Sequence, residues 1–198
     1  MKARASADLT ELSNAEVVLE AIRSRRVARD FTSDPLTKDQ LDKILTAGRW
    51  AATAGNRRIN RFLVVQDHRL LKLVRAIAPG IWAKPTALII ICVDLDIARQ
   101  DLVQIERDPS IQIDVGTAAM NMMLAAHVIG VGSCPVTSYS RSGLAKMLDL
   151  PANAIPEFIL QLGVPTPEAL QGHAGRGRRV TAADLTFWER YGRSSAGR

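Results

Sequence analysis

The spacing of apolar and polar residues predicts two amphipathic helices near the start of the chain. Each is opened by a capping box, in which two side chains satisfy free backbone amides at a helix start. Ser13 is followed three residues later by Glu16, and Thr37 by Gln40. Behind the second box, apolar residues recur at intervals of three and four over residues 41–48, which makes one continuous apolar stripe.

Three short apolar runs further along predict buried strands, and two stretches predict short helices. The strands fall at residues 62–65, 87–93 and 158–164, and the helices at residues 67–77 and around residues 144–148. Residues 94–113 are polar and mixed, and they resemble a covering segment more than core. Strands and helices alternate irregularly, which favours the α+β class.

Residues 115–129 are apolar nearly all round and stop at Gly130. A helix of this kind is buried on every side. It must therefore lie at the centre of the core or in a subunit interface, and a two-fold apolar interface is the common way to obtain the second arrangement. The pattern favours a homodimer.

The composition is that of a globular protein and favours a single domain over residues 1–198, with residues 1–12 as a flexible arm. Of 198 residues, 47% are apolar and 23% charged, enough for one substantial core. Cys92 and Cys134 lack the spacing of redox thiols, and no apolar signal segment opens the chain, so we expect a cytoplasmic protein without a disulfide framework. No run spans a bilayer. His127 has no second ligand one helical turn away, so no metal site is expected.

The net charge of +6 is concentrated in three arginine groups. They lie at residues 23–29, 57–61 and 176–179. Arginine forks converging from distant segments can hold phosphate oxygens, and the sequence lacks the glycine-rich motifs of dinucleotide-binding and P-loop folds. A mononucleotide is therefore the natural ligand. The alternative of another class is a basic, non-catalytic binding module, but no recognition motif supports a nucleic-acid partner.

Four segments, in order, resemble the flavin-dependent nitroreductase family. Residues 25–31 (Arg-Arg-Val-Ala-Arg-Asp-Phe) match its opening arginine motif, residues 52–57 its small-residue loop with asparagine, residues 114–132 its long core helix ending in Gly-x-Gly, and residues 187–192 its aromatic C-terminal segment. The resemblance covers nearly the whole chain.

This resemblance implies an α+β fold with a central, mostly antiparallel sheet flanked by helices. It also implies an intertwined homodimer, with residues 180–198 packing on the partner and flavin mononucleotide (FMN) at the interface. The implied cofactor contacts are the arginines Arg25, Arg26, Arg29, Arg178 and Arg179, the loop residues Ala52, Thr53, Asn56 and Arg58, and a flavin loop at residues 133–138 with Pro135, Val136, Thr137 and Ser138. Backbone amides of that loop can fix the ring edge.

The implied activity is reduction of an electron-poor acceptor, such as a nitroaromatic or quinone, with NADPH or NADH as the electron donor. Tyr139 and Arg141 border the flavin loop and are the candidate contacts to this small-molecule substrate. Two departures from the family pattern concern the site. Val27 stands where serine is usual, and Arg58 either places positive charge near the flavin or points to solvent.

A second interpretation keeps the flavin and changes the reaction. Residues 79–81 followed by Pro85, and residues 92–94, 125–127 and 134–136, look like the flavin subunit of cyclodipeptide oxidases, which dehydrogenate a small cyclic peptide and pass electrons to oxygen. That resemblance would add a small partner subunit.

Overall fold

The sheet is built around β2 (Ala87–Asp94), in which every residue but the last is buried. β1 (Asn60–Val65) pairs with one edge of β2, and β4 (Ala154–Gly163) pairs with the other. β3 (Gly132–Val136) lies outside β4, so that the order is β1-β2-β4-β3 and every pairing is antiparallel. The computed structural model describes residues 13–100, 109–170 and 180–192 of the chain.

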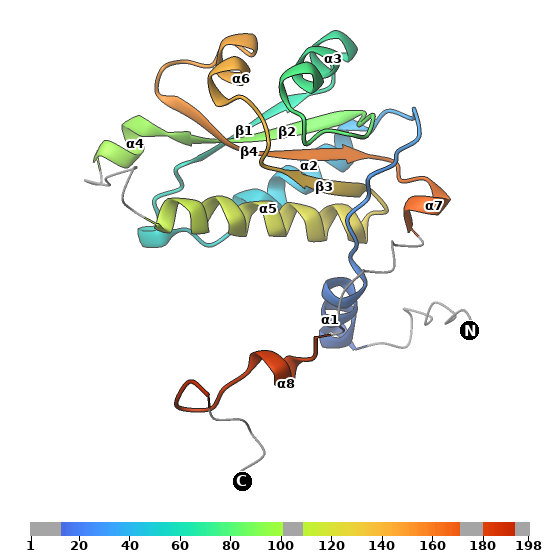
Figure 1. Cartoon of the computed structure of the whole chain (residues 1–198), viewed down its shortest axis with the longest axis vertical. Helices are drawn as coiled ribbons and strands as arrows, with labels where there is room; N and C mark the ends of the chain where they lie inside the picture. Colours follow the sequence, from blue (N-terminus) through green and yellow to red (C-terminus); the bar gives the residue numbers. More distant parts are fainter. Residues whose placement is uncertain (1–12, 101–108, 171–179, 193–198) are drawn as a thin grey trace.

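Helices cover both faces of this sheet (Figure 1). On one face lie α2 (Lys38–Arg49) and α5 (Ser110–Val128), and on the other lie α3 (His68–Ile77) and α6 (Arg141–Met147). The apolar residues of β2 contribute to the hydrophobic cores on both faces of the sheet, because successive strand residues point to opposite faces. Ile89 and Ile91 pack in the core under α2 and α5, whereas Leu88 and Ile90 pack in the core under α3 and α6. The α+β class predicted from the sequence is confirmed.

Both predicted capping boxes are present. Ser13 and Glu16 form the box that opens α1 (Asn14–Ser24), and Thr37 and Gln40 form the box that opens α2. The remaining short helices are η2 (Ala54–Asn56), α4 (Leu95–Gln100), α7 (Pro167–Leu170) and α8 (Ala182–Leu185).

Three predictions of local structure were wrong or incomplete. The segment expected as a flavin loop is in part the edge strand β3. Its glycine, serine and proline are typical of loops. An edge strand nevertheless tolerates Pro135, because one side of its backbone needs no sheet partner. β4 begins at Ala154, four residues earlier than predicted. The unassigned stretch at residues 94–113 contains α4 and the start of α5, and residues 101–108 lie outside the described part.

In the single chain, α5 is not buried on every side as predicted. Its inner face, which includes Ala118 and Met122, is fully buried against α2 and the sheet. Its outer face exposes Ile113 (62%), Met120 (46%) and Val128 (65%), which recur at helical spacing along one stripe. The sequence pattern is therefore that of a helix between the core of its own chain and a second apolar surface.

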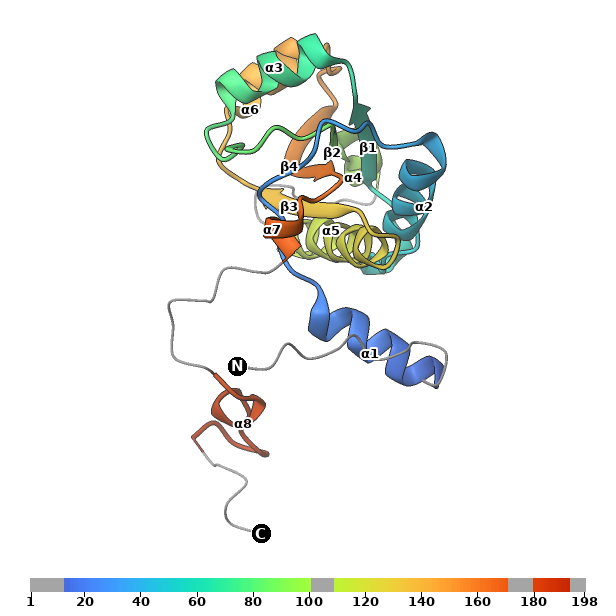
Figure 2. The same cartoon turned by 90° about the vertical axis from the view of Figure 1, so that its right-hand side faces the viewer.

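Two segments project from the body on the side of α5. α1 touches α5 and has no buried residue, and α8 lies still further out (Figure 2). Both carry exposed apolar side chains, among them Val18, Leu19 and Ile22 on α1 and Leu185, Phe187 and Trp188 around α8. Within the described residues, no helix has the length and apolar character needed to cross a membrane.

Candidate active site

The first arginine group begins at the end of α1, and its last residues lie against the end of the sheet. The Ala28 amide donates a hydrogen bond to the Ser133 carbonyl of β3 (3.0 Å), and the Thr32 amide donates to the Val164 carbonyl just beyond β4 (2.8 Å). Phe31 forms an isolated antiparallel bridge with Pro165. Residues 28–32 are thus fixed at both ends, and Arg29 projects from a short stretch of extended backbone. Residues 25–32, which follow α1, are called the arginine segment below.

Two glycines make this close approach feasible. Gly132 and Gly163 are register partners on β3 and β4, directly beneath the Phe31 ring. A Cβ atom on Gly163 would lie 2.8 Å from Cγ of Phe31, and one on Gly132 would lie 2.8 Å from Cβ of Ala28. Neither distance is tolerated between carbon atoms, so any side chain here would push the arginine segment off the sheet.

Gly163→Ala is therefore expected to displace the arginine segment and to cost about 1–3 kcal/mol of unfolding free energy through overpacking. Thermal unfolding of the variant measures this loss. The added methyl group would meet Cγ, Cβ and Cδ1 of Phe31. Phe31→Ala removes two of these three atoms, so the double variant Gly163→Ala/Phe31→Ala should lose less stability than the sum of the two single variants. Strictly additive losses would contradict this account of the glycine.

A second wall is formed by the loop between α3 and β2. The Gly80 amide donates to the Ser138 carbonyl (3.1 Å), and the Ser140 amide donates to the Ile77 carbonyl (2.9 Å). A Cβ on Gly80 would lie 2.7 Å from the Val136 side chain. The loop is thus docked backbone to backbone on the segment that follows β3. It carries Trp82, which is 81% exposed and whose indole nitrogen donates to the Pro79 carbonyl (2.6 Å).

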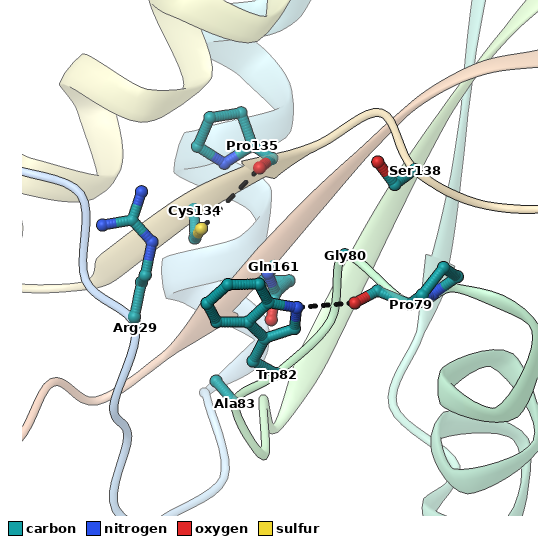
Figure 3. Close-up of a pocket in the computed structure, with 9 residues that line it drawn as sticks. All are labelled: Arg29, Pro79, Gly80, Trp82, Ala83, Cys134, Pro135, Ser138 and Gln161. Carbon is teal, nitrogen blue, oxygen red and sulfur yellow. Dashed lines mark hydrogen bonds between the residues drawn. The ribbon is translucent and has the colours of Figure 1, made fainter.

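Between these walls lies a cavity of about 350 Å³ (Figure 3). This volume is within the range of about 300–1,000 Å³ typical of small-molecule sites. The lining residues come from the arginine segment, the α3–β2 loop, β3 with its following turn, and β4: Arg29, Pro79, Gly80, Trp82, Ala83, Cys134, Pro135, Ser138 and Gln161. In Figure 3, Arg29 and Trp82 lie on either side of Cys134, and Gln161 lies behind the Trp82 ring.

The cavity is a slot lined mostly by neutral groups, with a positive charge on one side. Arg29 is the charged residue among the described residues that line the cavity. Burial raises the pKa of the Cys134 thiol, and the opposing effect of the nearby Arg29 charge is smaller. A thiol with a raised pKa stays protonated at neutral pH, so Cys134 is a neutral part of the wall. The slot is suited to a flat organic group that carries an anionic substituent.

Arg25 lies at the C-terminal cap of α1, four residues before Arg29. Its Nη1 atom is buried and has no hydrogen-bond partner among the described residues. The nearby His127 ring is neutral at neutral pH, because burial and the positive charges of Arg25 and Arg26 lower its pKa. His127 is instead hydrogen-bonded to the Ser24 hydroxyl (2.9 Å), which ties α1 to α5. A buried, unpaired guanidinium nitrogen is costly, and an anionic ligand would satisfy it.

The other predicted arginines are placed differently. Arg26 is exposed and donates to the carbonyls of Arg23 (2.7 Å) and Arg25 (2.9 Å), so it closes the end of α1. Arg178 and Arg179 lie outside the described residues.

The small-residue loop lies near the other end of α5. The Ala54 amide donates to Oδ1 of Asp114 (2.9 Å), and Asp114 is only 1% exposed. The Thr117 hydroxyl lies 3.0 Å from the Ala52 carbonyl. Asn56 and Arg58 both have positive φ (54° and 53°), conformations that side chains seldom adopt and that persist where the surroundings fix them.

Within this loop, Arg58 is exposed and turns back toward its neighbour. Its Nε donates to Oδ1 of Asn56 (3.3 Å), and its amide approaches the Thr53 hydroxyl (3.3 Å). In the single chain, Arg58 is thus part of the loop surface and not of the cavity.

Asp114→Leu is expected to release this loop, because the variant removes the acceptor for the Ala54 amide and leaves that donor unpaired, at a cost of about 1–3 kcal/mol. Amide hydrogen exchange at Ala54 should accelerate. Asp114→Asn is the matched control, because it keeps an oxygen at the Oδ1 position and should retain most of the protection. Unchanged exchange at Ala54 in the leucine variant would show that Asp114 does not hold the loop.

The two candidate substrate contacts lie outside the cavity lining. The Tyr139 hydroxyl donates to the Pro156 carbonyl (3.0 Å), and burial raises its pKa to about 12. Arg141 forms an ion pair with Glu157, which is displaced by a bulge in β4 and also accepts from Gln112 (3.1 Å). Both side chains therefore have structural partners in this chain, and their contact with substrate stays a prediction.

The structure thus brings together three of the predicted cofactor contacts, Arg29, Pro135 and Ser138. Val136 is buried in the core under α3 and α6, and Thr137 is exposed. The sequence interpretation did not assign to the site five of the residues that line the cavity, namely Pro79, Gly80, Trp82, Ala83 and Gln161. For Gln161 a signal was present, because a glutamine interrupts the apolar run of the strand.

Comparison with known proteins finds relatives in both sequence and structure. The sequence profile of the nitroreductase family matches residues 22–164. A protein of Archaeoglobus fulgidus, provisionally assigned as an NADH dehydrogenase/NAD(P)H nitroreductase, is 30% identical over 159 residues, which is 77% of this chain and 88% of the relative. An FMN reductase [NAD(P)H] of Bacillus subtilis is 26% identical, over 75% of this chain and 66% of its own length.

Solved structures share the fold. A provisionally assigned nitroreductase of Desulfovibrio desulfuricans, determined in complex with FMN, superposes with a TM-score of 0.72 at 26% identity and covers 88% of this chain and 97% of its own. NfrA1 of Bacillus megaterium superposes with a TM-score of 0.74 at 24% identity, over 88% of this chain and 75% of its own.

Proposed function

The chain belongs to the nitroreductase family, and we propose that it is an FMN-dependent oxidoreductase that takes electrons from NADPH or NADH and passes them to an electron-poor small molecule such as a nitroaromatic or quinone. The observation that carries the proposal is the cavity on the sheet face, whose neutral floor is flanked by Arg29. The FMN reductase relative and the FMN complex of the Desulfovibrio protein support the choice of flavin.

The residues present fit FMN. The buried Nη1 of Arg25 lacks a partner among the described residues and needs an anion, which the phosphate would provide. Arg29 would share this role, in line with the prediction from the arginine motif. Pro135 and Ser138 belong to β3 and the turn after it, where the backbone of an edge strand is open to a ligand on one side.

Flavin, when bound, supplies the capacity to accept a hydride and pass the electrons on. The chain's own residues bind and orient it. Arg25 and Arg29 would hold the anionic end. The α3–β2 loop and β3 form the two sides of the slot, and the exposed Trp82 would cover its outer part. No side chain of the chain is needed as an acid or base in this scheme, and Cys134 stays neutral because burial raises its pKa.

We also propose that the active form is a homodimer formed through the outer face of α5. In one chain, the small-residue loop is tied to Asp114 near the start of α5, whereas the arginine segment begins beside His127 at its end. These positions are 13 residues apart, or roughly 20 Å along a helix. A two-fold axis across α5 would place the start of one helix near the end of the other, so that Ala52, Thr53, Asn56 and Arg58 of one chain approach the cavity of the next.

The exposed surface supports this arrangement. Ile113, Met120 and Val128 form a bare apolar stripe on α5, and the apolar sides of α1 and α8 project beyond it. Gly116 lies on the same stripe, and a Cβ added there would meet nothing within 4 Å in its own chain. A glycine inside a helix costs about 0.5–1 kcal/mol relative to alanine, and close approach of a second helix would explain it.

An absorbance spectrum of the purified protein tests the function. Flavin bands that bleach on anaerobic addition of NADPH or NADH are the expected result. Flavin that stays oxidised would instead favour the cyclodipeptide-oxidase interpretation, and a neighbouring gene for a small partner subunit would strengthen it. A colourless protein that cannot be reconstituted with FMN would contradict both and leave the basic binding module, which salt-dependent binding to DNA would support.

A further inference from the structure

A polar side chain lies in the floor of the cavity, on a sheet face that is otherwise apolar. Gln161 is the register partner of Leu88 on β2 and of Cys134 on β3. It follows Ile159 by two residues on β4, so both side chains point to the face covered by α3 and α6. On that face the neighbours Leu88, Ile90 and Ile159 are fully buried apolar residues. An apolar residue would be expected at position 161.

Gln161 is 1% exposed, and its Oε1 atom has no hydrogen-bond partner among the described residues. Buried polar atoms in folded proteins nearly always have a partner, and one that lacks a partner destabilises the fold. The side chain nevertheless lines the cavity, and it lies behind the Trp82 ring in the view of Figure 3. The terminal torsion of a glutamine rotates readily, and such a rotation turns the unpaired acceptor toward whatever fills that space.

We propose that Gln161 holds the bound flavin from beneath, by accepting a hydrogen bond from a donor group of the cofactor. The donor is either the imide N–H of the ring or a hydroxyl of the ribityl chain, which share the same chemistry. This inference rests on the proposed function. It assigns to the central sheet a polar cofactor contact in addition to the arginines that hold the phosphate.

Gln161 is the lining residue with a strong side-chain acceptor that is both buried and unpaired. Pro79, Gly80, Ala83 and Pro135 bring no polar side-chain atom, and Arg29 and Trp82 offer donors but no acceptor. The Ser138 hydroxyl can accept, but Ser138 is exposed, so solvent satisfies it when the cavity holds no ligand. A site that hydrogen-bonds a ligand donor discriminates against analogues that lack it, because its own buried acceptor would stay unpaired. Gln161 is thus a positioning residue that favours flavin over flat, apolar aromatic molecules of similar size.

The test is Gln161→Met, which keeps the length of the side chain and removes the carboxamide. Affinity of the full-length, flavin-freed protein for FMN is measured by quenching of flavin fluorescence, and we expect a loss of about tenfold. Thermal unfolding without flavin should rise by about 2–4 °C, because the variant removes an unpaired buried acceptor. This opposite movement of ligand affinity and flavin-free stability is not expected of a residue that only packs.

Gln66→Met is the matched control, because Gln66 is exposed, donates to the Leu36 carbonyl and lies outside the cavity. It should leave FMN affinity unchanged. Lumiflavin, which has the ring without the ribityl chain, separates the two donors. An equal loss for lumiflavin assigns the ring N–H, and a loss confined to riboflavin and FMN assigns a ribityl hydroxyl.

Wild-type affinity for FMN in Gln161→Met would overturn the assignment and leave the flavoprotein function intact. A lower melting temperature with unchanged affinity would give Gln161 a packing role. A wild-type protein that takes up no FMN would overturn the proposed function itself, and this result is seen before any variant is compared.

Discussion

Replacing Met120 with glutamate is expected to leave the chain folded, monomeric and unable to retain FMN. Met120 lies in the middle of the exposed stripe of α5, 46% exposed in the single chain, so the glutamate is solvated and harmless there. In a two-fold interface the same residue occurs twice, and each unpaired carboxylate would be desolvated at a cost of several kcal/mol. Because about 1.4 kcal/mol is a factor of ten, dimer affinity should fall by about 10³-fold or more.

Size-exclusion chromatography with light scattering measures the mass, and the ratio of flavin to protein absorbance measures the bound cofactor. Leu73→Glu is the matched control, because Leu73 is 50% exposed on α3, on the opposite side of the sheet. The control should remain dimeric and yellow. A Met120→Glu protein that stays dimeric would place the interface elsewhere, and a monomer that keeps its flavin would show that one chain completes the site.

The elements that could be predicted from the sequence are those whose cause is local. Capping boxes lie within four residues, and an isoleucine-rich run such as that of β2 is buried in almost any packing. β3 could not be predicted, because its residues form a strand only through pairing with β4, whose register the local pattern does not contain. For α5 the helix itself could be predicted, but not which surface covers each of its faces. An apolar residue such as Val128 gives the same pattern in the sequence whether its own chain or a second copy covers it.

The candidate site divides in the same way. Arg29, Pro135 and Ser138 were found because a short motif carries each of them, and the structure brings them to one cavity. Gln161 could not be placed there in advance, because its position beside Cys134 depends on how β3 aligns with β4. The roles of Gly132 and Gly163 could not be predicted either, because nothing near Gly163 in the sequence shows that the Phe31 ring packs against it.

Arg25→Met/Arg29→Met should reduce affinity for FMN by about 10²- to 10⁴-fold. Charge-assisted hydrogen bonds contribute about 1.5–3 kcal/mol each, and about 1.4 kcal/mol corresponds to a factor of ten. The structure motivates both positions, because Arg25 has a buried Nη1 without a partner among the described residues and Arg29 lines the cavity. Fluorescence titration of the full-length protein with FMN and with riboflavin measures the effect.

Riboflavin is the informative comparison, because it lacks the phosphate and keeps the ring and ribityl chain. If the two arginines hold the phosphate, the double variant should bind riboflavin almost as well as the wild type does, and the preference for FMN over riboflavin should disappear. Arg23→Met is the control for loss of charge alone, since Arg23 is exposed and paired with Glu20 on α1. Equal losses for FMN and riboflavin would instead mean that the arginines act on the ring or ribityl chain, and the phosphate would then need another cation.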